Sequence, residues 1–114
     1  MTQPHEKRAA RRVAVNLTAH CRIGTRFMKE PVGDLSRGGL YLRTREPVSE
    51  GLPVRVALAL PHDDGPRFCT LVGNVARLVR DERGRPLGIG VSFSSEQIAA
   101  PDLETLDGYL SRVG

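Results

Sequence analysis

The sequence contains no tryptophan and few other aromatic residues, three phenylalanines and two tyrosines. Surfaces that bind single-stranded nucleic acid usually present aromatic side chains along a basic groove. Here the aromatic residues fall mostly at positions that the pattern assigns to the core, namely Phe27, Tyr41, Phe68, Phe93 and Tyr109. We therefore expect no nucleic acid partner.

Metal-binding and catalytic motifs are also missing. Cys21 and Cys69 lie far apart with no CxxC pair, which indicates two buried thiols in a reducing compartment. The three histidines are dispersed, and there is no glycine-rich phosphate loop and no carboxylate dyad. We expect no enzyme, no metal and no cofactor.

No apolar run is long enough to span a membrane, and the charged N-terminus does not resemble a signal peptide. We therefore expect a soluble cytoplasmic protein without membrane insertion. A chain of 114 residues suits one compact domain.

Positive charge is concentrated in residues 1–12. This segment holds Lys7, Arg8, Arg11 and Arg12 against Glu6, a net +3 of the total +4. It lacks apolar periodicity, so we expect a flexible basic arm on a nearly neutral body. A broad nucleic acid footprint is not expected from this distribution.

Alternation of apolar and polar residues with a period of two begins abruptly at position 13 and predicts a strand over 13–23. Turn residues separate five further predicted strands, at 27–32, 40–44, 54–60, 68–79 and 87–93. Pro31 predicts an edge or a bulge, and Gly73 a bend or a bulge. Gly88 and Gly90 predict close packing or strong curvature on the second face of the last strand.

The period changes at the C-terminus. Pro101 favours a helix start, and one apolar stripe follows at spacings of three and four, formed by Leu103, Leu106, Leu110 and Val113. Gly108 weakens this helix by about 1 kcal/mol, so the stripe must dock on the sheet. The fold class we predict is all-β, a six-stranded antiparallel barrel over residues 13–114 with a C-terminal α-helix. A β-sandwich with a docked helix is the alternative.

Two short motifs carry the functional hypothesis. Arg8 and Arg12 stand four residues apart in the arm, and Asp34, Ser36 and Gly39 lie between the second and third predicted strands. A carboxylate, a hydroxyl and a glycine on a turn, facing arginines on an arm, suit a small anionic ligand with guanine-like edges. In an isolated DxS turn, however, the aspartate and serine usually bond only their own backbone.

Taken together, RxxxR at residues 8–12 and DxSxxG at residues 34–39 closely resemble the paired signature of PilZ domains. The glycine-rich last strand and the terminal helix also resemble this family, so that the likeness covers residues 8 to about 113. The resemblance implies the PilZ barrel and a receptor for the bacterial second messenger cyclic di-GMP. Each motif is common alone, and their order and separation make the likeness specific.

The resemblance implies a role for each motif residue. Arg8 and Arg12 would contact phosphate and guanine, whose O6 and N7 atoms suit a guanidinium fork. Asp34 would accept from guanine N1–H and the exocyclic amine, and Ser36 would bond a base or a phosphate. Gly39 would allow the ligand to approach the backbone closely.

Three further candidates are secondary. Lys7 and Arg11 would add positive field, and Arg77 would stack on a base unless it is simply an exposed strand residue. Arg37 and Arg43 are interpreted as surface charges. The family also implies binding as a monomer or as an intercalated dimer of the dinucleotide, which Lys7 does not decide, in a protein that is a monomer or a weak dimer.

Without a catalytic domain, such a receptor is expected to signal through an unidentified effector protein, by ordering of the arm when the ligand binds. The alternative is a PilZ-fold interaction module that binds no nucleotide.

Overall fold

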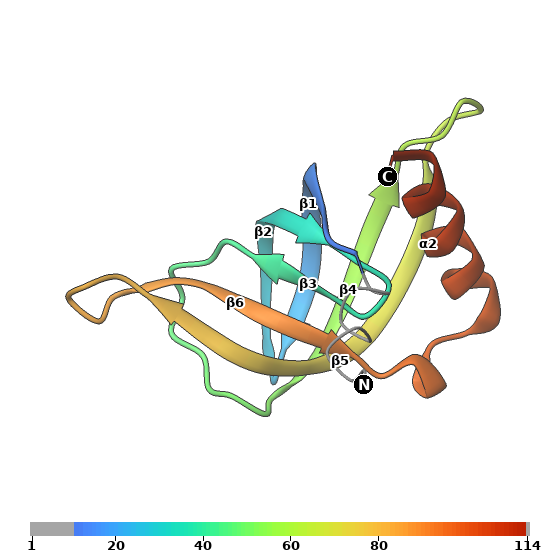
Figure 1. Ribbon diagram of the computed structural model, residues 1–114. Coiled ribbons are helices and arrows are strands. Elements are labelled where there is room, and N and C mark those ends of the chain that lie inside the picture. The colour runs from blue at the N-terminus through green and yellow to red at the C-terminus, as the bar shows by residue number, and fades with distance from the viewer. Residues whose placement is uncertain (1–10, 114) are drawn as a thin grey trace, which may run out of the picture.

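The computed structural model describes residues 11–113 of the chain. These residues form six strands, one short 3-10 turn and one helix (Figure 1). The elements are β1 (Val13–Ile23), β2 (Arg26–Leu35), β3 (Gly39–Leu42), β4 (Pro53–Leu60), β5 (Arg67–Arg80), β6 (Pro86–Phe93), η1 (Ser95–Gln97) and α2 (Ala100–Val113).

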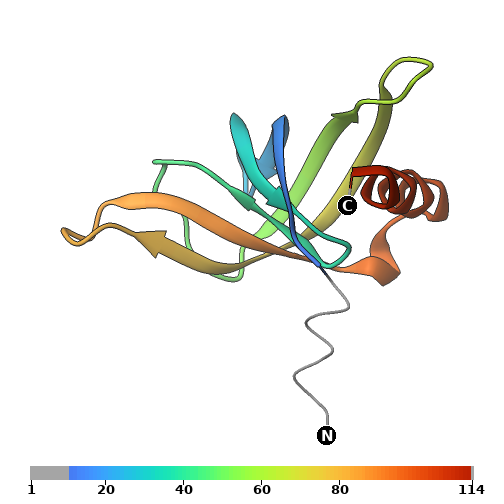
Figure 2. The same cartoon turned by 45° about the horizontal axis from the view of Figure 1, so that its top comes forward.

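The strands close into an antiparallel barrel in the order β1-β2-β3-β6-β5-β4. This confirms the predicted barrel and the C-terminal helix. The alternation is clearest in β4, where Val54, Val56, Leu58 and Leu60 are buried and the residues between them are exposed. Two long hairpins, β4–β5 and β5–β6, extend beyond the closed part (Figures 1 and 2).

Two predicted boundaries near the motif were wrong. β2 continues to Leu35, so Asp34 belongs to a strand and not to the turn. β3 ends at Leu42, although the alternation extends to Thr44. Thr44 is nevertheless 2% exposed, and its buried hydroxyl is satisfied because it donates to Glu30 Oε2 at 2.6 Å and accepts from the Glu46 amide at 3.1 Å.

Pro31 agrees with expectation, whereas Gly73 does not mark a bulge. Pro31 pairs with Thr18 of β1, but the β2–β3 pairing ends at Val32, so the other side of Pro31 is a local edge, as predicted. The Pro31 carbonyl accepts from the Arg43 amide at 2.9 Å, just beyond the end of β3. Proline has no N–H to donate, and at this position the β2–β3 ladder has ended, so no ladder hydrogen bond is lost. Gly73 is paired on both sides, and the bulge of β5 lies at Ala76, between the pairs of Val75 and Arg77.

Helix α2 packs against the part of β5 that precedes its pairing with β6. This ladder begins at Gly73, so the preceding residues have a free edge. The Thr70 amide at this edge donates to Asp102 Oδ1 of α2 at 3.2 Å. Leu106 of the predicted stripe and the neighbouring Tyr109 are buried, with exposures of 0% and 7%, whereas Val113 at the end of the stripe is 44% exposed. The predicted docking of the helix is therefore observed.

Two phenylalanines contradict the expectation that the aromatic residues lie in the core. Phe27 is 81% exposed and Phe68 is 74% exposed. Both stand on the outer face of the barrel, because Phe27 pairs with Arg22 and Phe68 with Ala59, residues that also point outward.

In residues 11–113, no helix is long and apolar enough to cross a membrane.

Candidate functional site

The turn between β2 and β3 is held together by the side chain of Ser36. This residue is 2% exposed, and its hydroxyl donates to the Gly39 carbonyl at 3.3 Å. It also accepts from the amides of Gly38 and Gly39, both at 3.2 Å. Since a hydroxyl offers one proton and two lone pairs, its bonding capacity is filled inside the turn.

Gly39 allows two strands to approach closely. A Cβ placed there would overlap the carbonyl oxygen of Val91 and lie 3.2 Å from its carbonyl carbon. Gly39 pairs with Ser92, and the neighbouring Gly38 carbonyl accepts from the Phe93 amide at 2.8 Å. The glycine of the motif thus has a structural role at the β3–β6 contact.

Asp34 is turned outward by a bulge. The β2–β3 register shifts between Val32 and Asp34, so that Asp34 stands opposite Tyr41 while Leu35 is fully buried. Its Oδ1 lies 2.6 Å from Nη1 of Arg12, with side-chain exposures of 32% and 49%. The structure therefore brings together two predicted site residues that lie 22 positions apart.

A row of paired residues continues from Asp34 across three strands. Asp34 pairs with Tyr41 on β3, Tyr41 with Gly90 on β6, and Gly90 with Arg77 on β5. At about 4.8 Å for each strand spacing, the row covers about 14 Å. Arg77, one of the secondary candidates, is thus on the same side of the barrel as Asp34.

Glycines on this side are covered by longer side chains. A Cβ at Gly90 would lie 2.9 Å from Cγ of Arg77, and one at Gly88 would overlap the ring of Tyr41. A Cβ at Gly33 would lie 2.9 Å from Cδ2 of Tyr41. The close packing predicted from the small residues of the last strand is confirmed.

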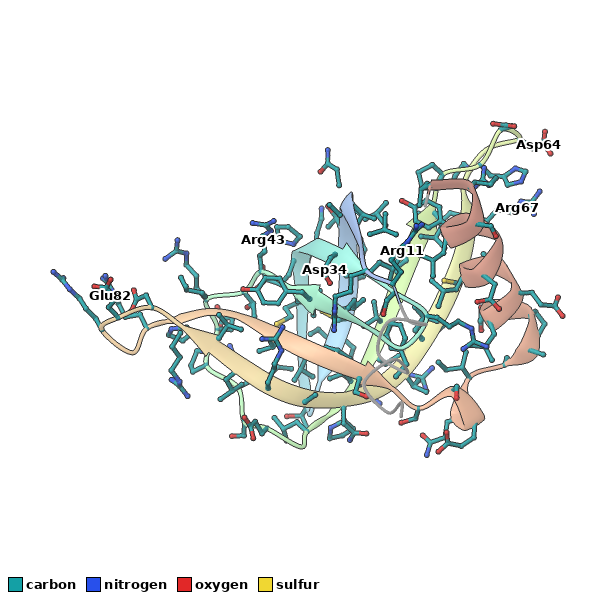
Figure 3. All side chains as sticks on the ribbon, in the orientation of Figure 1. Arg11, Asp34, Arg43, Asp64, Arg67 and Glu82 are labelled. Carbon is teal, nitrogen blue, oxygen red and sulfur yellow. The ribbon has the colours of Figure 1, made fainter. Side chains whose placement is uncertain are left out.

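We call the outer surface formed by these side chains the motif face; its members are Arg12, Asp34, Tyr41, Arg43 and Arg77. Sequence reasoning missed two of them. Tyr41 was not considered as a site residue, and Arg43 was interpreted only as a surface charge; its Nε lies 3.2 Å from where a Cβ of Gly33 would be. The signal for both was the set of outward glycines. Figure 3 shows Asp34 in the middle of the molecule, far from Asp64 and Glu82 at the hairpin tips.

Some predicted positions cannot be placed on this face. Arg8 and Lys7 lie outside the described residues, and Arg11 is exposed next to Arg12. Arg37, in the motif turn, pairs through Nε with Asp107 Oδ1 of α2 at 2.6 Å. The turn is therefore linked by an ion pair to the C-terminal helix.

The two thiols are buried and have no part in this face. Cys21 Sγ donates to the Met28 carbonyl at 3.6 Å. Burial raises the pKa of Cys21 and of Cys69 from 9.0 to about 11 in each case, so that both are protonated at neutral pH. Over residues 11–113, no three His, Cys, Asp or Glu side chains are grouped to hold a metal ion.

A small closed barrel with a terminal helix, and with arginines around one outward carboxylate, defines a single module of the all-β class. The family model of the PilZ domain matches residues 6–112, and the chain belongs to the PilZ domain family. No curated protein matched the chain.

Solved structures share the fold. The Bacillus subtilis inhibitor of motility MotI/DgrA is 21% identical, with a TM-score of 0.73 over 89% of this chain and 48% of that one. The Borreliella burgdorferi PlzA protein, solved in complex with c-di-GMP, is 14% identical, with a TM-score of 0.55 over 87% of this chain and 39% of that one. The chain thus spans less than half the length of either.

Proposed function

We propose that this PilZ domain is a receptor for cyclic di-GMP and binds it on the motif face. The observation that carries the proposal is the Arg12–Asp34 pair, which joins the two signature motifs on one surface of a PilZ barrel at 2.6 Å. PlzA, a protein of the same fold, is described in complex with this dinucleotide.

The chemistry of the face suits the ligand. Arg12, Arg43 and Arg77 supply guanidinium groups for the two phosphates and for the acceptor edge of guanine. Asp34 supplies a carboxylate that complements the donors guanine N1–H and its exocyclic amine. The side chain of Arg77 lies over Gly90. We infer that its guanidinium plane is available to stack on a base.

Binding requires the Arg12–Asp34 pair to exchange partners. Both side chains are partly exposed, and an ion pair of this kind contributes at most about 1 kcal/mol. Each charge-assisted hydrogen bond to the ligand contributes about 1.5–3 kcal/mol. Breaking the pair therefore costs little, and the pair holds both groups at the site until the ligand arrives.

Ser36 and Gly39 take different roles in this proposal from those implied by the family resemblance alone. With its hydroxyl saturated, Ser36 shapes the turn, and Gly39 allows β3 to meet β6. Both position Asp34, and the Ser36 hydroxyl is not free to contact the ligand. Arg8 and Lys7 of the arm complete the charge around the phosphates.

Ligand binding would order the N-terminal arm over the motif face, and an effector protein would bind the ordered form. The Arg37–Asp107 pair gives a second connection, because it joins the motif turn to α2. A shift of the turn on binding would therefore also displace or release α2 at Asp107.

Calorimetric titration of cyclic di-GMP into the wild type, Arg12→Ala and Asp34→Ala tests the proposal, with GTP as a ligand control. Arg83→Ala, in the exposed β5–β6 turn, is a matched control for loss of an arginine. We expect binding to fall at least about tenfold in the two site variants and to be unchanged in the control. Equal affinity in all four proteins would overturn the assignment.

One observation favours the alternative, a PilZ-fold interaction module without nucleotide. The hydroxyl of Ser36 and the space at Gly39 are already used by the protein itself. Absence of heat and of a thermal shift in the wild type would support this second function.

A further inference from the structure

β1 and β4 separate along part of their length. They pair only through residues 20–23 of β1 and 54–57 of β4. Residues 13–19 of β1 and 58–60 of β4 therefore have no strand partner on their facing sides, although both strands continue. Figures 1 and 2 show the two strands diverging from their paired ends.

The outer surface is hollowed at this separation. Two adjoining hollows of about 500 and 550 Å³ share His20, Lys29, Ala57 and Thr70. Phe27 lines the first and Phe68 the second. We call the combined depression the β1–β4 groove.

The groove is basic. Arg22 stands opposite Arg55, and His20 opposite Lys29, in adjacent strands on the outer face. The like charges of Arg22 and Arg55 stand directly opposite one another, an arrangement that destabilises a sheet. No carboxylate lines either hollow, and within residues 11–113 none of these four side chains has one within 4.0 Å. An anionic partner would relieve this repulsion.

Two exposed aromatic rings mark the ends of the groove. Phe27 and Phe68 are separated by three strand spacings and four residues along β4, about 20 Å over the surface. An extended chain of about six residues spans this length. Large aromatic rings at such exposure are typical anchors for a partner.

We propose that the β1–β4 groove docks an extended acidic segment of a partner protein. Between the diverging strands, the backbone of the segment pairs with the free edge at residues 58–60 of β4, close to Phe68 on the neighbouring strand. The segment then leaves the sheet and continues over the outer face of the paired residues, where its carboxylates meet Arg22, Lys29 and Arg55 and an apolar side chain covers Phe27. None of the five motif-face residues lines the groove, and we expect its occupation not to depend on cyclic di-GMP.

A polypeptide fits better than a nucleic acid strand. A peptide backbone supplies both donors and acceptors at the spacing of the unpaired N–H and C=O groups of the strand edges, whereas a phosphate backbone supplies acceptors only. The two phenylalanines are also too far apart to stack on neighbouring bases. Apolar floor residues such as Leu17 and Leu58 supply no contact that a phosphate backbone needs.

The test uses a random linear peptide library displayed on phage and panned on the immobilised full chain without dinucleotide. The enriched peptides are then labelled with fluorescein and titrated by anisotropy. We expect acidic sequences with alternating apolar residues, which bind at least about tenfold more weakly to Arg55→Glu and Phe68→Ala. Arg55→Glu keeps the fold because the new carboxylate faces Arg22.

Arg83→Glu is the matched control, with the same charge reversal on the exposed β5–β6 turn, and should bind as the wild type does. Failure to enrich peptides, enrichment without acidic residues, or equal binding by Arg55→Glu would overturn the proposal. So would binding of oligo(dT) or of phosphatidylglycerol vesicles that Arg55→Glu abolishes, because this would assign the groove to another partner.

Amide hydrogen exchange gives a second readout. With bound peptide, exchange should slow at residues 58–60, and protection only at the motif turn would contradict strand addition. Arg12→Ala should keep peptide binding, and Arg55→Glu should keep dinucleotide binding. Dinucleotide binding on the motif face and peptide docking in the β1–β4 groove can thus be refuted independently of each other.

Discussion

Replacing Gly39 by alanine tests whether the glycine of the motif serves the barrel or the ligand. The Gly39 backbone is not in the left-handed region, so alanine is conformationally allowed and the effect is steric. The added methyl group would overlap the backbone carbonyl of Val91, which no rotamer change relieves. β3 and β6 must then separate near the 2.8 Å hydrogen bond from Phe93 to Gly38. We expect a loss of about 1–3 kcal/mol in the free energy of unfolding.

Gly108→Ala is the matched control. It makes the same chemical change in α2, where a Cβ would meet nothing within 4 Å. Helix propensity predicts a gain of about 0.5–1 kcal/mol. The two variants should therefore move stability in opposite directions.

Urea unfolding followed by far-UV circular dichroism measures both changes, and thermal melts give a second estimate. For a domain of roughly 100 residues, 1 kcal/mol shifts Tm by about 4–8 °C. If Gly39→Ala unfolds within about 0.5 kcal/mol of the wild type yet loses dinucleotide binding, the steric argument is refuted. Gly39 would then contact the ligand directly.

Three other predictions follow from the same contacts. Ser36→Ala leaves two amides of the turn without their acceptor and should cost about 1–3 kcal/mol, measured by urea unfolding; an unchanged midpoint would contradict it. Arg12→Ala breaks only a partly exposed pair with Asp34 and should change the free energy of unfolding by less than about 1 kcal/mol, so a large drop in Tm would show a structural role. Burial raises the pKa of Cys21 and Cys69 to about 11, so the stability they contribute is intact below about pH 9 and is lost as pH rises toward 11. Urea midpoints across this range should fall, and the fall should shrink in a variant with both cysteines replaced by alanine.

Much of the barrel could be predicted from local pattern. Alternation in residues 13–23 and 54–60 reflects strands with one face in the core, and the change of period after Pro101 marks α2. The paired signature could be recognised because it is short and ordered along the chain. The glycines of β6 indicated that other groups pack closely on this strand, but the sequence did not show that these groups are Tyr41 and Arg77.

The motif face and the groove could not be predicted in this way. Asp34 faces outward only because a bulge shifts the register of β2, and a bulge depends on how two strands meet. Phe27 and Phe68 look like core residues, but strand pairing places them on the outer face.

The sequence by itself determined the order of the strands along the chain, the helix and the family signature, because these follow from periodicity and spacing. Tertiary structure alone decided that Arg12 meets Asp34, that Arg77 shares their face, and that β1 parts from β4. These features depend on register and closure, which bring together residues tens of positions apart. The conformational preferences of neighbouring residues do not determine which distant residues meet. The packing of the strands around one shared core does.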